Sequence, residues 1–126
     1  RESIFSADGP KGSGPYSPAM RWGDTVYVSG QVAIDPATNQ VIPGSLEDEA
    51  HRTFKNLEAQ LKAAGSGLER CVKVTVYLAD MGTFGEMNGV YAKHFGDHRP
   101  ARATVQAAAL PKNVGVEIDV IACLPS

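Results

Sequence analysis

The sequence predicts an α+β two-layer sandwich, in which one mixed, mostly antiparallel sheet carries two helices on a single face. Two observations lead to this fold class. Five segments have the alternation or the composition of strands, and two segments carry apolar residues at spacings of three and four. Their order along the chain is strand, strand, helix, strand, helix, strand, strand. A chain of 126 residues suits one domain, so residues 1–126 are expected to form a single domain.

The first strands surround a loop rich in glycine and proline. Residues 3–6 can form a short strand, and residues 8–15 are expected to be loop. Residues 25–29 (TVYVS) alternate and predict a half-buried strand. Gly30 follows directly, and a glycine at the end of a strand marks a bulge or the close approach of a ligand or another backbone.

The first helix has a clear start and a clear end. Ser45 is a good N-cap, and the acidic residues 47–49 suit the positive end of the helix dipole. The helix is expected to end at Gly65 and to cover the sheet with one apolar face. That face consists of Leu46, Ala50, Phe54, Leu57, Leu61 and Ala64. His51 has no metal-ligand partner at i+4 and is expected at the surface or edge.

The second half repeats a strand and a helix. Residues 72–78 (VKVTVYL) predict a strand whose polar face meets water or a second subunit. Its expected core face carries Val72, Val74, Val76 and Leu78. Residues 83–86 have the pattern of a capping box, which predicts a second helix ending at Gly96. His94 and His98 flank that end without zinc-site spacing, and contacts with the helix dipole explain them more simply.

The last two predicted strands contain the candidate site. Residues 103–109 and 116–123 are joined by a connection of hairpin length, so Arg102 and Glu117 are expected to face each other on neighbouring strands. A guanidinium beside a carboxylate is a receptor for a small polar acid. The alternative, which the residues alone favour slightly, is a cross-strand ion pair contributing a few tenths of a kcal/mol up to about 1.

Two further side chains have open roles at this stage. Tyr16 follows the glycine-rich loop directly and either packs against the protein or closes a pocket as a lid. Asn88 lies in the middle of the second helix, where asparagine is mildly unfavourable, and either anchors a neighbouring loop or is exposed.

Composition and charge exclude several classes of protein. Twelve basic and fourteen acidic residues give a net charge of −2, which disfavours nucleic acid as an obligate partner. No apolar run approaches the ~20 residues of a membrane span, and residues 1–12 lack the apolar core of a signal peptide, so a soluble, cytoplasmic protein is expected. Cys71 and Cys123 lie in or beside apolar runs and are expected to be reduced thiols; no metal site is expected.

Several short motifs, taken together, resemble those of one family. They are GPYS at 14–17, VSGQ at 28–31, MNxxY at 87–91, PAR at 100–102, LPK at 110–112 and VEI at 116–118. In this order they resemble the Rid family, the reactive intermediate (enamine/imine) deaminases, also known as the YjgF family. The resemblance covers nearly the whole chain.

The resemblance implies an assembly and an activity. The expected assembly is a chorismate-mutase-like homotrimer, in which the polar sheet faces pack around a central axis and ligand clefts lie between subunits. The expected reaction is hydrolysis of 2-iminobutyrate and 2-iminopropionate to 2-oxo acids and ammonia. Those imines arise from enamines that pyridoxal-phosphate dehydratases release from threonine and serine. No cofactor is expected, because an iminium carbon is already electrophilic.

The resemblance also implies roles for individual residues. Arg102 would clamp the substrate carboxylate, and Glu117 would lie near the attacking water. Tyr16 would close the cleft, and the backbone around Ser29 and Gly30 would line it.

Three positions complete or modify this set. Asn88 and Thr104 would contribute to substrate binding. Thr104 stands where many bacterial members have cysteine, so a cysteine nucleophile is not implied and a backbone group is expected to act there. Pro18 stands where glutamine is frequent, which changes the expected shape of the Tyr16 loop.

Two other function classes remain open from the sequence. One is a non-catalytic binding or regulatory protein that senses 2-oxo acids or amino acids in the same Arg102 cleft. The other is an endoribonuclease or translation inhibitor, which the absence of a basic surplus and of a placed histidine pair disfavours.

Overall fold

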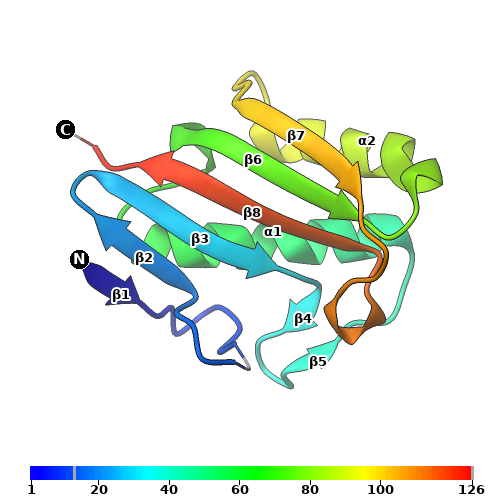
Figure 1. The fold of residues 1–126 in the computed structure, drawn as a ribbon, viewed down its shortest axis with the longest axis horizontal. Coiled ribbons are helices and arrows are strands. Elements are labelled where there is room, and N and C mark those ends of the chain that lie inside the picture. Colours follow the sequence, from blue (N-terminus) through cyan, green and yellow to red (C-terminus); the bar gives the residue numbers. More distant parts are fainter. Residues whose placement is uncertain (13, 126) are drawn as a thin grey trace.

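The computed structural model describes residues 1–12 and 14–125. A six-stranded sheet forms one layer, and two helices cover one of its faces (Figure 1). In spatial order the strands are β1 (Glu2–Ile4), β2 (Ala19–Trp22), β3 (Thr25–Gln31), β8 (Val116–Cys123), β6 (Cys71–Leu78) and β7 (Ala101–Gln106). The helices are α1 (Leu46–Ala63) and α2 (Phe84–Phe95), and a separate small sheet pairs β4 (Ile34–Asp35) with β5 (Gln40–Val41).

The predicted fold class is confirmed. Neighbouring strands of the large sheet are antiparallel except β6 and β7, which are parallel. The sequence did not predict β2, β4 and β5, which have only two to four residues each and show little alternation. No helix among residues 1–12 and 14–125 is long and apolar enough to cross a membrane.

Helix α1 begins and ends as predicted. The Ser45 hydroxyl accepts a hydrogen bond from the Asp48 N–H, and the Asp48 carboxylate accepts one from the Ser45 N–H. Gly65 follows the last turn with a left-handed φ of 85°, which favours glycine. Leu46 of this stripe is partly buried, whereas Phe54, Leu57 and Leu61 are fully buried against the sheet. Each such side chain contributes about 1.5–3 kcal/mol through burial.

The predicted capping box of α2 is wrong. Among the described residues, Thr83 makes no side-chain capping hydrogen bond, and its hydroxyl donates to the Asp80 carbonyl at 2.7 Å. The Asp80 carboxylate instead accepts from the Gly82 N–H at 2.8 Å and holds a short 3₁₀ turn, Met81–Thr83, before the helix. This local turn keeps the Thr83 backbone near helical geometry, so its side chain points back along the chain.

The predicted core position of Val72 is also wrong. Cys71 pairs with Ala122 and Lys73 pairs with Ile121, so Val72 is an extra residue in β6. The bulge leaves the Val72 side chain 52% exposed and gives the core position to Cys71.

Strand β7 does not form a hairpin with β8, as the sequence had predicted. It spans Ala101–Gln106 rather than 103–109 and lies at the edge of the sheet, paired with β6. The reason is the connection between β6 and β7, which runs through α2; a helical crossover returns the chain parallel to the strand it left. Strand β6 therefore separates the strands that carry Arg102 and Glu117.

Candidate active site

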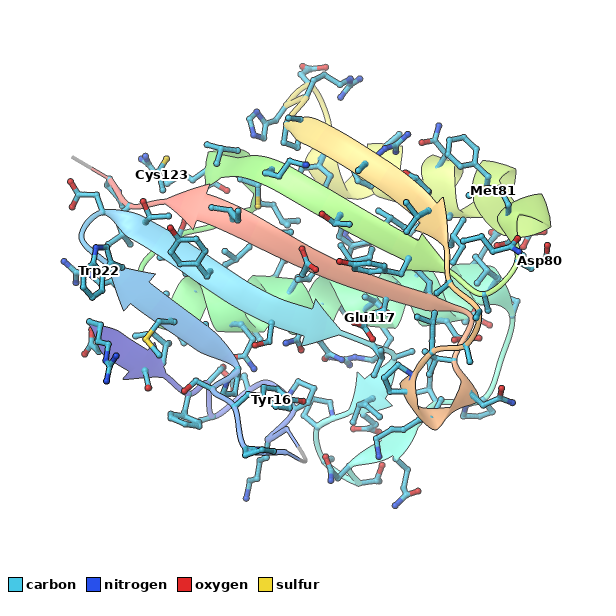
Figure 2. All side chains as sticks on the ribbon, in the orientation of Figure 1. Tyr16, Trp22, Asp80, Met81, Glu117 and Cys123 are labelled. Carbon is cyan, nitrogen blue, oxygen red and sulfur yellow. The ribbon has the colours of Figure 1, made fainter. Side chains whose placement is uncertain are left out.

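A cavity of about 420 Å³ borders the helix-free face of the sheet and contains four of the predicted site residues. Tyr16, Ser29, Gly30 and Glu117 all line it. Figure 2 shows Tyr16 on the N-terminal loop and Glu117 on β8. The other lining residues are Pro10, Gly12, Pro18, Gln31, Val32, Ile34, Asn39, Pro111 and Lys112.

Glu117 lies directly against the backbone of Gly30. A Cβ at position 30 would lie 2.8 Å from the Glu117 carboxyl carbon and 3.1 Å from its Cγ, closer than side-chain atoms normally approach. The pairing of β3 with β8 also shifts its register between Val28 and Gln31. The sequence prediction of a bulge and a close approach at Gly30 is therefore confirmed.

The Glu117 carboxyl is in an environment that favours its neutral form. Burial raises its pKa above the usual value of 4.5, and the negative charge of Asp119 raises the pKa further. Asp119 shares the outer face of β8 with Glu117 and accepts a hydrogen bond from the Tyr77 hydroxyl at 3.0 Å. A carboxyl group whose pKa is raised in this way can take up and return a proton at a higher pH than an exposed glutamate can.

Tyr16 is held over the cavity and not within the core. Its side chain is 54% exposed. The loop behind it is tied to β3, because the Ser29 N–H donates to the Pro18 carbonyl at 2.9 Å and the Ser29 hydroxyl donates to the Ser17 carbonyl at 2.7 Å. Of the two roles left open for Tyr16, this geometry favours the lid.

The remaining predicted site residues form a second group beside α2. The Arg102 guanidinium donates a hydrogen bond to the Asn88 side-chain oxygen at 2.7 Å. Its central carbon lies 4.7 Å from the centroid of the Tyr91 ring and 5.5 Å from that of Phe84. Asn88 thus neither anchors a loop nor is merely exposed; it orients Arg102. Thr104 lies two residues from Arg102 on β7, and within the described chain its buried hydroxyl oxygen has no hydrogen-bond partner.

These two groups cannot meet within one chain. Glu117 is in register with Tyr77 and Arg102 with Val74, which separates them by about 10 Å along the strands and about 10 Å across β6. Arg102 also packs on α2, whereas Glu117 lies on the face without helices. The predicted facing of Arg102 and Glu117 on neighbouring strands is therefore wrong, and so is the alternative of an ion pair between them.

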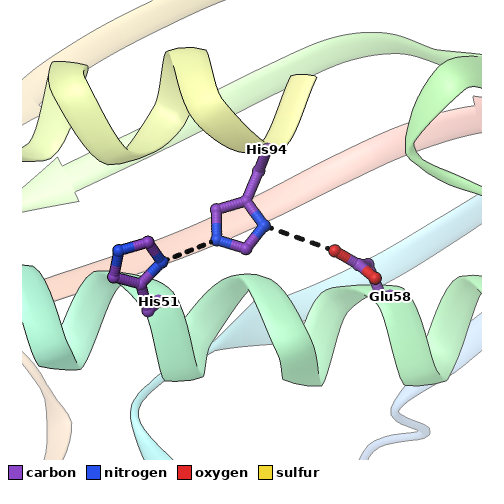
Figure 3. Close-up of polar contacts among 3 residues, drawn as sticks. All are labelled: His51, Glu58 and His94. Carbon is purple, nitrogen blue, oxygen red and sulfur yellow. Dashed lines mark hydrogen bonds and ion pairs between the residues drawn. The ribbon is translucent and has the colours of Figure 1, made fainter. Parts of the chain in front are cut away.

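The structure also brings together histidines that the sequence treated separately. The His51 Nδ1 and His94 Nε2 atoms are 2.9 Å apart, and His94 Nδ1 lies 3.3 Å from a Glu58 carboxylate oxygen (Figure 3). Burial lowers the pKa of His94, and Glu58 opposes this shift. The sequence did not predict this contact, because it joins α1 to α2 across 43 residues. In the described residues no three His, Cys, Asp or Glu side chains are placed to hold a metal ion.

The two cysteines are free thiols, as predicted. Cys71 is buried and Cys123 is partly buried. Burial, with smaller effects of neighbouring acidic groups, raises the pKa of Cys71 to about 12, so its thiol stays protonated at neutral pH.

Together, the fold and the two groups of residues define a small two-layer α+β protein. A cavity with a partly buried carboxyl lies on one face of its sheet, and an arginine bound to an asparagine lies on the other. The chain belongs to the family described as Endoribonuclease L-PSP, whose model matches residues 6–124. This is the YjgF or Rid family, so the resemblance found in the sequence motifs is confirmed.

Two relatives are similar to this chain along almost the whole length of both proteins. A 2-iminobutanoate/2-iminopropanoate deaminase from Mus musculus is 46% identical over 122 residues, which are 97% of this chain and 90% of that protein. A RutC family protein from Pyrococcus horikoshii is 44% identical over 122 residues, 97% of both chains.

Solved structures agree with the fold. RidA from an Antarctic Psychrobacter superposes with a TM-score of 0.94 at 40% identity, covering 98% of this chain and 100% of that one. TdcF from E. coli, with bound serine, has a TM-score of 0.94 at 34% identity, covering 99% of this chain and 100% of that one.

Proposed function

We propose that this protein hydrolyses small 2-imino acids, such as 2-iminobutyrate and 2-iminopropionate, to 2-oxo acids and ammonia. The observation that carries the proposal is the separation of two complementary half-sites. One chain presents a cavity with a partly buried carboxyl, Glu117, while its Arg102 lies on the opposite face, on the edge strand β7. A cleft between subunits that joins the Glu117 cavity of one chain to Arg102 of the next completes a receptor for an imino acid. Relatives named imine deaminases support the same chemistry.

A homotrimer is the proposed assembly. The outer face of the sheet carries no helix, and side chains with apolar surface are exposed over it, among them Tyr27 on β3 and Val105 on β7. An uncovered face of this kind is typical of a sheet that packs against another subunit. Three such sheets around an axis bring the edge strand of each chain towards the next.

Binding in this cleft depends on Arg102. A guanidinium has five donors in a planar fork; one is used on Asn88, and the others remain for a substrate carboxylate. The Asn88 bond and the Tyr91 ring fix the plane of the fork before substrate arrives. Such preorganisation reduces the entropy cost of holding the acid.

Glu117 supplies the proton transfers. Water forms a C–O bond to the iminium carbon, the C=N π electrons move to nitrogen, and Glu117 accepts a proton from the water. Glu117 then returns that proton to nitrogen, and the C–N bond breaks as the C=O bond forms. The departing ammonia takes the hydroxyl proton and leaves as ammonium, so the reaction needs no cofactor or metal.

Subunit complementation tests the shared cleft. Arg102→Ala should abolish hydrolysis and 2-oxobutyrate binding, whereas Glu117→Gln should keep 2-oxobutyrate binding within a few-fold but lower turnover by ~10²-fold or more. In trimers reassembled from equal amounts of the two variants, about one quarter of the clefts receive both parent residues, since each residue is correct in about half of them. About a quarter of the parental ammonia release from freshly generated 2-iminobutyrate is therefore expected. Each variant reassembled alone is the control, and a mixture that stays inactive would contradict the inter-subunit site.

A second candidate is a non-catalytic sensor of amino acids or 2-oxo acids. It is favoured by one observation, that the related TdcF structure holds serine. Binding of 2-oxobutyrate without ammonia release from 2-iminobutyrate would select this function. The endoribonuclease named in the family description stands third, because a net charge of −2 provides no general attraction for RNA.

A further inference from the structure

The backbone at the cavity is unusual at two positions. Among the described residues, Asn39, Lys112 and Asn113 are the non-glycine residues with positive φ, at 59°, 58° and 58°. Asn39 and Lys112 both line the Glu117 cavity. Side chains other than glycine seldom adopt this conformation, and residues held in it cluster at functional sites. Lysine in particular is not a residue that the left-handed region prefers.

Both residues bring hydrogen-bond donors to the same cavity. Asn39 lies in the turn between β4 and β5, and Lys112 lies in the short turn Pro111–Asn113 before β8. In Figure 1 the orange loop that contains Lys112 runs close to β4 and β5. Lys112 is the one lysine or arginine among the described lining residues, and no ion-pair partner for it occurs in the part of the chain that the structure describes. Its positive charge is therefore available to a ligand.

The cavity is also larger than a short imino acid requires. A volume of about 420 Å³ falls in the range of roughly 300–1,000 Å³ that accommodates drug-sized ligands. 2-Iminobutyrate, with an ethyl side chain, occupies only a part of it. The lining residues include the apolar Val32 and Ile34 and the polar Asn39 and Lys112.

We propose that Lys112, assisted by Asn39, binds a second carboxylate at the end of the substrate side chain, so that 2-imino dicarboxylates such as 2-iminoglutarate are substrates. The inference rests on the proposed imine hydrolysis and names a further substrate class for that site. Arg102 of a neighbouring subunit binds the carboxylate beside the imine, Glu117 serves the water, and Lys112 binds the distal carboxylate. An ammonium paired with a carboxylate forms a charge-assisted hydrogen bond, which a neutral ethyl group cannot replace.

The test compares two imines and their 2-oxo acid products. Ammonia release is measured from freshly generated 2-iminoglutarate and 2-iminobutyrate, and binding of 2-oxoglutarate and 2-oxobutyrate is measured by calorimetry. Lys112→Gln should lower the ratio of kcat/KM for the dicarboxylate over the monocarboxylate by ~10-fold or more, and the ratio of affinities likewise. Lys112→Arg should restore most of both ratios. Lys93→Gln, the same charge change on the exposed face of α2, should leave both ratios at the parental value.

A second variant controls for the possibility that Lys112→Gln disturbs the turn. Lys112→Asn removes the charge with a residue that tolerates the left-handed conformation, and it should lower both ratios as Lys112→Gln does. Two outcomes overturn the inference while imine hydrolysis stands. In the first, both ratios are unchanged in both variants. In the second, the parent neither hydrolyses 2-iminoglutarate nor binds 2-oxoglutarate more tightly than 2-oxobutyrate. If the parent hydrolyses neither imine yet binds 2-oxoglutarate through Lys112, the deaminase function is overturned, and the binding of a second carboxylate by Lys112 still stands.

Discussion

Replacing Gly30 with alanine places a methyl group against the Glu117 carboxyl and leaves the cavity otherwise intact. The new Cβ would lie 2.8 Å from the Glu117 carboxyl carbon, whereas ordinary carbon contacts are about 3.5–4.0 Å. The carboxyl must therefore move by roughly 1 Å, and a displacement of that size in a catalytic group can cost ~10²-fold in rate. We expect Gly30→Ala to lower kcat for 2-iminobutyrate by about that factor.

Stability should change much less than activity in the same variant. The φ of Gly30 lies outside the left-handed region, so alanine meets no backbone strain there. The moving group is the end of a side chain, and an off-rotamer torsion costs about 0.5–1.5 kcal/mol. Binding of 2-oxobutyrate, which the proposed function assigns to Arg102, should persist within a few-fold.

The control is another glycine replaced in the same way. A Cβ at Gly85, on the exposed side of α2, would meet no described atom within 4 Å. Gly85→Ala should keep full activity and raise the unfolding free energy by at most about 0.5–1 kcal/mol, because alanine favours a helix and Gly85 lies in the first turn of α2. Steady-state kinetics, calorimetry and urea unfolding of both variants give the answer. Parental kcat in a folded, trimeric Gly30→Ala protein would refute the role of the Gly30–Glu117 contact.

Two further predictions follow from the shifted pKa values. Because burial raises the pKa of Glu117, the native state holds its proton longer than the unfolded state, and stability is lost as pH rises from 4.5 through the raised pKa. Glu117→Gln should therefore be more stable than the parent at pH 8 and not at pH 4 in urea unfolding; a parent that is the more stable protein at pH 8 would contradict this. Because burial lowers the pKa of His94, the unfolded state binds its proton first, and stability is lost as pH falls below 6.5. His94→Gln should lose less stability than the parent between pH 7.5 and 5. Equal losses would show that folding does not lower the pKa of His94.

Features of this protein that depend on residues close together in the sequence could be predicted. The cap at Ser45, the apolar stripe of α1 and the stop at Gly65 depend on interactions within one or two helical turns. Strand β8 was predicted with its observed bounds, because alternation along Val116–Cys123 places alternate side chains on opposite faces. The close approach at Gly30 was signalled by a glycine ending a strand.

Features that depend on pairing between distant segments were not predictable in this way. The exposure of Val72 follows from the fact that β6 has one extra residue relative to β8 at this point. The alternation of residues within β6 alone does not reveal such a bulge. The His51–His94 contact depends on how α1 and α2 pack, whereas the sequence placed His51 at the surface or edge and explained His94 by the dipole of its own helix. Lys112 was missed because lysine gives no sequence signal for left-handed backbone. Asn39 was missed because only the packing of distant segments places its turn at the cavity.

The amino-acid sequence by itself determined the layers of the fold and indicated the two charged residues Arg102 and Glu117 of the candidate site, since motifs, caps and alternation are local properties. Only the tertiary structure decided where the two charged residues of that site lie. The crossover through α2 makes β7 a parallel partner of β6, so β6 separates β7 from β8. Arg102 is in register with the buried Val74 and faces α2, whereas Glu117 is in register with Tyr77 on the helix-free face. One chain alone therefore cannot bring them together.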